Sequence, residues 1–205
     1  NREESKLFYA GYINEKKQAK FLDSHLGLNK PKLKAQKKSA EDFIIESLGK
    51  NKVSILAIGP LTNIAGAIQR RPEVLNNISQ LVIMGGALNV QGNSTLHAET
   101  NFWFDAPAAQ TVLRAGIKNT VLIPLDLTNQ MVFDYEIYKK LINQKDSPLL
   151  KLFKQHAGES HPFSYPSFED NKQAKIYFWD LLASTYLIHP EIFSEAKSYK
   201  LDVVS

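Results

Sequence analysis

The sequence from residue 53 to residue 63, VSILAIGPLTN, predicts a buried β-strand that leads into a helix. Its first six residues are apolar apart from Ser54, which is typical of a strand covered on both faces. Gly59-Pro60 then ends the strand, and the pattern from Thr62 to Arg71 predicts a helix that stops before Pro72. A strand followed by a helix is the building unit of parallel sheets.

Further units of the same kind follow along the chain. A short apolar run precedes Gly85-Gly86, and another precedes Asp126. The predicted strands cover residues 53–58, 81–84 and 120–125, and the predicted helices cover residues 39–49, 62–71, 107–115 and 176–188. We therefore expect an α/β fold, an open and mostly parallel sheet flanked by helices, in a single domain over residues 1–205. Residues 129–175 are predicted to be an irregular, aromatic excursion over the active-site end, and residues 199–204 a last strand.

Composition excludes several classes of protein. The chain has no cysteine, so disulfides, thiolate metal sites and cysteine nucleophiles are excluded, and a reducing cytoplasm fits. No run of about 18 apolar residues occurs, which argues against a membrane span. The net charge of +4 comes from residues 1–40, which hold ten Lys or Arg against four Asp or Glu. Lysine-rich stretches such as Lys30 to Lys38 are more often solvated loops than phosphate tracks, so we expect no nucleic-acid partner.

Polar residues gather where the predicted strands end, which is where ligands bind to parallel sheets. The stretch from Gly92 to Asn101 carries Glu99 and the amides of Asn93 and Asn101, which together can satisfy several hydroxyls of a sugar. A polar surface loop is the alternative. Glycines after two strands let backbone approach a ligand, or simply form tight turns.

Trp179-Asp180 stands at the start of an otherwise apolar helix. Asp180 is either a helix cap or a hard oxygen ligand for Mg²⁺ or Ca²⁺. Trp179 is either part of the core or a flat surface for a base. Composition leaves both choices open.

An ordered set of motifs extends from Leu56 to Asp180 and resembles the inosine-uridine preferring nucleoside hydrolases. The matching residues are Leu56 to Ala65, Val82 to Gly86, Gly92-Asn93, Ala98 to Asn101, Asp105 and Leu125 to Thr128. The resemblance implies hydrolysis of the N-glycosidic bond of ribonucleosides, with one Ca²⁺ at the base of the pocket. It also implies a small-molecule nucleoside substrate, a role in purine salvage and a homo-oligomer.

The resemblance also assigns roles to residues. It implies that the main-chain carbonyl of Ile58 and the carboxylate of Asp180 bind calcium, whose bound water attacks the sugar after an Asp deprotonates it. The ribose would be held by residues matching Met84, Asn93, Glu99 and Asn101, with Asn101 and Trp179 as catalytic residues. Many members carry His where Trp179 stands, and there the His protonates the leaving base. The purine-specific branch has Trp, which stacks on the base, so we expect purine nucleosides as substrates.

One family motif has no match in this sequence. The family begins with an Asp-rich strand end, Asp-x-Asp-x-Gly-x-Asp-Asp, which supplies the catalytic base and further calcium ligands. We therefore interpret the chain as a fragment truncated at both ends, and expect residues 1–205 alone to be inactive. The alternatives are a non-catalytic relative that binds nucleosides or ribosyl groups, and a nucleic-acid-binding protein that uses residues 1–40.

Overall fold

The structure is a computed structural model that describes residues 36–157, 168, 171–194 and 196–203. The chain divides into two compact units. Unit 1 comprises the described residues up to Leu127 together with those from Asp180 onward, and unit 2 comprises those from Thr128 to Trp179. Each unit is described by itself below. No helix of the described part is long and apolar enough to cross a bilayer.

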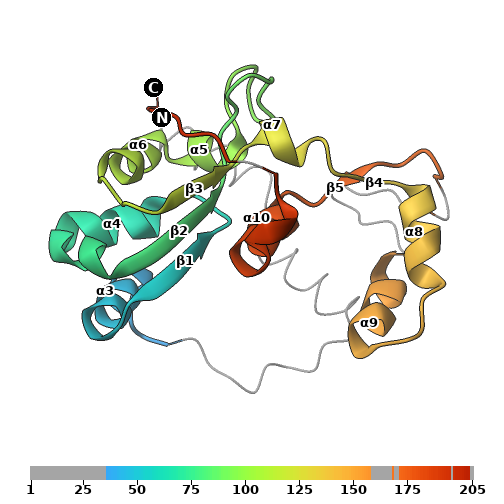
Figure 1. Cartoon of the computed structure of the whole chain (residues 1–205), viewed down its shortest axis with the longest axis horizontal. Coiled ribbons are helices and arrows are strands. Elements are labelled where there is room, and N and C mark those ends of the chain that lie inside the picture. Colours follow the sequence, from blue (N-terminus) through green and yellow to red (C-terminus); the bar gives the residue numbers. More distant parts are fainter. Residues whose placement is uncertain (1–35, 158–167, 169–170, 195, 204–205) are drawn as a thin grey trace. The chain divides into compact units, whose positions relative to one another are not determined.

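Unit 1 contains a parallel sheet of three strands in the order β1-β2-β3 (Figure 1). The strands are β1 (Val53–Ala57), β2 (Ile78–Met84) and β3 (Thr120–Ile123). Ile55 pairs with Leu81, and Val82 pairs with Val121. The predicted parallel sheet with flanking helices is confirmed, and each strand lies within three residues of its predicted place.

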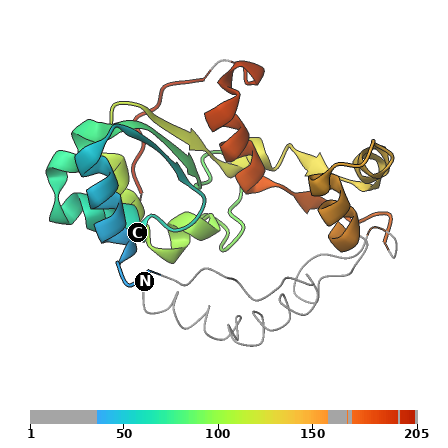
Figure 2. The ribbon, with the colours of Figure 1, turned by 90° about the horizontal axis from the view of Figure 1, so that it is seen from below.

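Unit 1 also contains most of the helices of the described residues, although α7 ends at Thr128 and α10 begins at Trp179, both of which are in unit 2. In chain order they are α3 (Ala40–Lys50), α4 (Thr62–Arg70), the 3₁₀ helix η1 (Pro72–Asn77), α5 (Thr100–Phe104), α6 (Ala106–Arg114), α7 (Leu125–Thr128), α10 (Trp179–Ile188) and the 3₁₀ helix η2 (Pro190–Ile192). Helix α4 contacts both α3 and α6, and Figure 2 shows these helices beside the strands. The helix predicted from Ser39 is confirmed, because the Ser39 hydroxyl accepts a hydrogen bond from the Asp42 amide at 3.1 Å.

The core of unit 1 joins the central strand to the helices. Leu81 and Ile83 of β2 are fully buried, and they pack in one cluster with Leu61, Ile64 and Val112. These apolar side chains explain why a short strand with no hairpin partner is stable here, since burial of an apolar side chain contributes about 1.5–3 kcal/mol.

The described residues of unit 2 form regular elements, so the predicted irregularity of this excursion is wrong, whereas its predicted aromatic character is confirmed. It holds an antiparallel pair, β4 (Val132–Phe133) with β5 (Ile176–Tyr177), and the helices α8 (Tyr135–Ile142) and α9 (Pro148–Ala157). Its core is aromatic, because the ring of Phe133 contacts those of Phe153, Phe168 and Phe178 with centroids 4.9–5.8 Å apart. Two other aromatic residues of the excursion, Phe163 and Tyr165, lie outside the described residues.

Two further predicted elements differ from the structure. The last helix begins at Trp179 rather than Ile176, because Ile176 and Tyr177 pair with β4. Residues 199–203 form no paired strand in the described part of the chain. Side chains of α6 hold this segment instead: Gln110 Nε2 donates to the Val203 carbonyl at 2.8 Å, and Arg114 forms an ion pair with Asp202.

Candidate functional site

The carboxyl ends of the three parallel strands carry Ile58-Gly59, Gly85-Gly86 and Asp126, as predicted. Main-chain hydrogen bonds between the chain after β2 and the chain after β3 continue beyond the ends of these strands. The Gly85 amide donates to the Ile123 carbonyl at 3.3 Å, and the Leu125 amide donates to the Gly86 carbonyl at 2.9 Å. The chain that leaves β2 is therefore fixed before it enters the loop that carries Asn93.

The two glycines after β2 are required by the fold. A Cβ at Gly85 would lie 2.5 Å from a carbon of the Phe102 ring, and Gly86 has a φ of +80°. Close packing and a left-handed backbone therefore explain this pair without a ligand. Gly59 differs, because a Cβ there would meet no atom within 4 Å.

Glu99 is the buried centre of the predicted ribose site. It is 2% exposed and caps α5. Its Oε1 accepts a hydrogen bond from the main-chain N–H of Asn101 at 2.9 Å. Its Oε2 accepts from the main-chain N–H groups of Gly86 at 3.0 Å and Phe102 at 3.1 Å. A carboxylate has about four acceptor positions, so these three amides leave about one position on Oε1 for a ligand hydroxyl.

Glu99 and Asp180 influence each other electrostatically within unit 1. Desolvation raises the pKa of Glu99, its three amide donors oppose that shift, and the negative charge of Asp180 raises the pKa further. Desolvation likewise raises the pKa of Asp180 at the start of α10. Because two nearby negative charges repel each other, a positively charged group bound beside Glu99 and Asp180 would favour ionisation of both carboxyl groups.

Asn101 and Met84 also lie at this site. The Asn101 side chain donates from Nδ2 to the Met84 carbonyl at 3.1 Å, and Nδ2 lies 3.4 Å from the Met84 sulfur. Met84 is 2% exposed at the end of β2. The structure therefore brings together three of the predicted ribose-binding residues, Met84, Glu99 and Asn101, at the end of the central strand.

Asn93 lies in the exposed loop before α5, where its side chain stabilises the loop. Its Oδ1 accepts from the amide of Thr100 at 2.9 Å and from the Thr100 hydroxyl at 3.0 Å. The loop folds back on itself so closely that a Cβ at Gly92 would lie 2.2 Å from the Ala98 carbonyl oxygen. In this structure the Asn93 oxygen is therefore used by the protein, which leaves its NH₂ group for a ligand.

Asp126 was missed as a functional residue by the sequence analysis, although its place after the third strand was a signal. Its Oδ2 accepts from the Leu88 amide at 2.8 Å and its Oδ1 from the Asn89 amide at 2.7 Å. Desolvation opposes the ionised form, but these hydrogen bonds outweigh it and lower the pKa of Asp126. An ionised carboxylate whose oxygens both bind backbone is suited to hold the loop, and poorly suited to act as a general base.

The predicted calcium ligands are incomplete as a cation site. Ile58 follows β1 and is 48% exposed, and Asp180 is exposed at the start of α10. Within the described ranges, no group of three or more His, Asp or Glu side chains is arranged to hold a metal ion. Calcium takes six to eight oxygen ligands, so the described residues alone do not make a full site.

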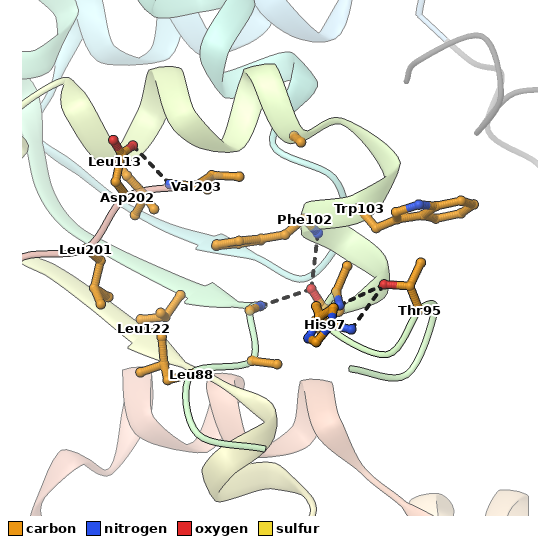
Figure 3. A pocket seen from close by; sticks show the side chains of 15 residues that line it. Leu88, Thr95, His97, Phe102, Trp103, Leu113, Leu122, Leu201, Asp202 and Val203 are labelled. Atoms are coloured by element: carbon orange, nitrogen blue, oxygen red, sulfur yellow. Dashed lines mark hydrogen bonds between the residues drawn. The ribbon is translucent and has the colours of Figure 1, made fainter. Parts of the chain in front are cut away.

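A cavity of about 500 Å³ lies beside this cluster in unit 1 (Figure 3). Its wall is mainly apolar and includes Phe102, Leu113, Leu122 and Val203, and Glu99 is the one predicted site residue that lines it. Met84, Asn93 and Asn101 do not line it. Apolar walls suit a sugar poorly, so we do not place the ribose there.

Trp179 belongs to unit 2, where its ring is held in a fixed orientation. Its Nε1 donates to Asn129 Oδ1 at 3.0 Å, and its ring is stacked with that of Tyr177, with centroids 6.0 Å apart. The side chain is half-buried and lies outside the buried aromatic cluster of this unit.

Comparison with known proteins gives consistent matches. Residues 11–205 match the family model described as inosine-uridine preferring nucleoside hydrolase. The non-specific ribonucleoside hydrolase RihC of Salmonella schwarzengrund is 38% identical over 144 residues, which are 69% of this chain and 43% of that protein. The probable uridine nucleosidase 1 of Oryza sativa subsp. japonica is 30% identical over 181 residues, 84% of this chain and 52% of that one.

Solved structures agree with these sequence matches. The purine-preferring ribonucleoside hydrolase from Gardnerella vaginalis superposes with a TM-score of 0.67 at 29% identity, over 84% of this chain and 54% of that one. The chain thus spans about half the length of the proteins it matches.

Proposed function

Since the chain belongs to the inosine-uridine preferring nucleoside hydrolase family, we propose that the full-length protein hydrolyses the N-glycosidic bond of ribonucleosides. The products would be ribose and the free base. The cluster of Met84, Glu99 and Asn101 at the end of β2 is the observation that carries this proposal. It offers a carboxylate and an amide, held by backbone hydrogen bonds, at the edge of the sheet where ligands bind.

The cluster has the chemistry that sugar cleavage requires. Hydroxyl groups of ribose can donate to the open acceptor position of Glu99 and to the amide oxygen of Asn101. As the bond to the base breaks, the sugar gains oxocarbenium-like positive charge, which the ionised forms of Glu99 and Asp180 would stabilise. The desolvation that raises the pKa of both groups also strengthens their attraction to such a charge.

Purine nucleosides are the substrates we propose, with Trp179 stacking on the base. The likeness to the purine-preferring hydrolase from Gardnerella vaginalis supports this preference. The relatives also include a probable uridine nucleosidase and a non-specific hydrolase, so the test includes uridine.

Calcium is the cofactor we propose for the full-length protein. The Ile58 carbonyl and the Asp180 carboxylate would supply two of its oxygen ligands. Because the described residues do not complete such a site, we assign no chemical step to the ion. A homo-oligomer and a role in purine salvage complete the proposal and rest on the family resemblance, and a cytoplasmic location is proposed because the chain has no cysteine.

The test is a hydrolysis assay on the full-length protein with inosine, guanosine and uridine. Reducing sugar and free base should appear in equal amounts, and a chelator should abolish both. Asn101→Leu should lower kcat/KM by about 10²-fold or more, since it removes hydrogen bonds that strengthen in the transition state. Asn143→Ala is the matched control, because Asn143 is an exposed residue at the end of α8. Binding of inosine without turnover would favour the non-catalytic relative instead.

A further inference from the structure

The β4–β5 ladder of unit 2 brings Asn129 and Trp179 to the same end of the antiparallel pair. Val132 is paired with Tyr177, so the chain before Val132 and the chain after Tyr177 leave the ladder side by side. The indole Nε1 of Trp179 then donates to Asn129 Oδ1 at 3.0 Å. The orientation of the indole is therefore fixed by the ladder and by one hydrogen bond.

Tyr177 covers one face of the same ring. The two ring planes are within 4° of parallel and the centroids are 6.0 Å apart, which is an offset stack. Within the described part of the chain, Tyr177 is the one ring that stacks on Trp179. Trp179 is partly exposed, and the face of the indole opposite Tyr177 is where a second flat ring would stack.

We propose that Asn129 and Tyr177 are positioning residues that hold Trp179 as a one-sided stacking surface for the nucleoside base. This inference rests on the proposed function. The indole N–H is the only donor of the Trp179 side chain, and Asn129 accepts it, so the ring offers the base a π surface and no proton. Base preference then depends on the orientation of the ring, because a purine has a larger face to stack than a pyrimidine.

The first test compares Asn129→Leu with Asn129→Asp in the full-length protein. Leu removes the acceptor at similar volume, whereas Asp keeps an oxygen that can accept the indole N–H. We expect Asn129→Leu to lower the ratio of kcat/KM for inosine to kcat/KM for uridine by about three- to tenfold, the usual range for one aromatic stack. Asn129→Asp should restore the ratio, and Asn143→Ala should not change it. An equal loss for both nucleosides would overturn the inference, since a general structural defect acts on both.

A second test does not depend on turnover. Hypoxanthine should quench tryptophan fluorescence in the full-length protein. The part of this quenching that is lost in Trp179→Phe reports the base that stacks on Trp179. Asn129→Leu should weaken hypoxanthine binding in this assay about three- to tenfold, and Asn129→Asp should not. If hypoxanthine quenches Trp179 but the protein does not hydrolyse nucleosides, the proposed activity is contradicted and the stacking surface is supported. Hydrolysis without such quenching would contradict the stacking surface alone.

Discussion

Glu99 and Asp126 bind the same short segment of backbone from two different elements. Glu99, at the start of α5, accepts from the Gly86 amide, and Asp126, after β3, accepts from the amides of Leu88 and Asn89. Their pKa values move in opposite directions: desolvation dominates at Glu99 and raises its pKa, whereas at Asp126 the amide donors outweigh desolvation. The segment that leaves β2 is thus held by one carboxylate that resists ionisation and one that favours it.

Replacing Asp126 by Asn should loosen this segment. An amide has one acceptor oxygen, so at least one of the Leu88 and Asn89 amides loses its partner, at a cost of about 1.5–3 kcal/mol for a hydrogen bond to a charged group. Hydrogen exchange should become faster at residues 86–89 and stay unchanged at the β1–β2 pairing. Asp146→Asn is the control, because it removes an exposed carboxylate that pairs with Lys154. Unchanged exchange at residues 86–89 would show that Asp126 does not hold the loop.

The stability of the protein should depend on pH through Glu99. Its folded pKa is raised above 4.5, so the folded state binds this proton more readily than the unfolded state does. Its contribution to stability is present at low pH and is lost as pH rises through the raised pKa. We therefore expect the free energy of unfolding of the wild type, relative to Glu99→Gln, to fall with rising pH above 4.5. Denaturation between about pH 4 and 8 measures this difference, and a difference independent of pH would contradict the shift.

Alanine at the two glycine turns should have different effects. Gly85→Ala places a methyl group against the Phe102 ring and should cost about 1–3 kcal/mol of unfolding free energy, as overpacking does. Gly59→Ala meets no neighbour and should stay within about 0.5 kcal/mol of the wild type. If backbone at Gly59 approaches the substrate, Gly59→Ala should also raise KM for inosine. Equal destabilisation by both substitutions would contradict the packing described for Gly85.

Residues 1–205 on their own should neither bind Ca²⁺ at micromolar concentrations nor hydrolyse inosine. Among the described residues, the two ligands that the family resemblance implies, Ile58 and Asp180, would supply too few oxygens for calcium, and lack of the general base that the resemblance implies would lower the rate by about 10²–10⁴-fold. Calorimetry with Ca²⁺ and an inosine turnover assay measure both properties. In the full-length protein, Asp180→Asn should weaken calcium binding. Turnover by residues 1–205 would mean that another residue serves as the base.

The sequence predicted the strands of unit 1 where apolar, β-branched residues are buried on both faces. It missed the first three residues of β2, Ile78 to Gln80, because two of them are polar. These residues are held in the strand by pairing with β1, which a local sequence pattern does not reveal. It also predicted a helix over Ile176 and Tyr177, since a short apolar run has no period that separates helix from strand. The strand predicted at residues 199–204 does not form over the described residues 199–203, because a strand needs a partner, which a local pattern does not specify.

The candidate site was predictable as a set of residues and not as a set of contacts. Glu99 and Asn101 stand out because a carboxylate and an amide follow a buried strand. The bond from Asn101 to the Met84 carbonyl depends on tertiary packing across 17 positions of the chain. Asp126 accepts hydrogen bonds from main-chain amides 37 and 38 positions away. Every residue except proline has such an amide, so the sequence does not indicate which ones Asp126 binds.

The order of strands in unit 1 has a consequence for how the protein folds. Neither β1 and β2 nor β2 and β3 are joined by a hairpin, so both pairings must close long loops. The connection from β1 to β2 is the shorter one, and loop-closure entropy grows with length, so this pair should assemble first. Strand β3 would then join last and bring Asp126 to the backbone of residues 88 and 89. The segment of residues 86–89 would therefore acquire its final shape only in the slow, closing step of refolding.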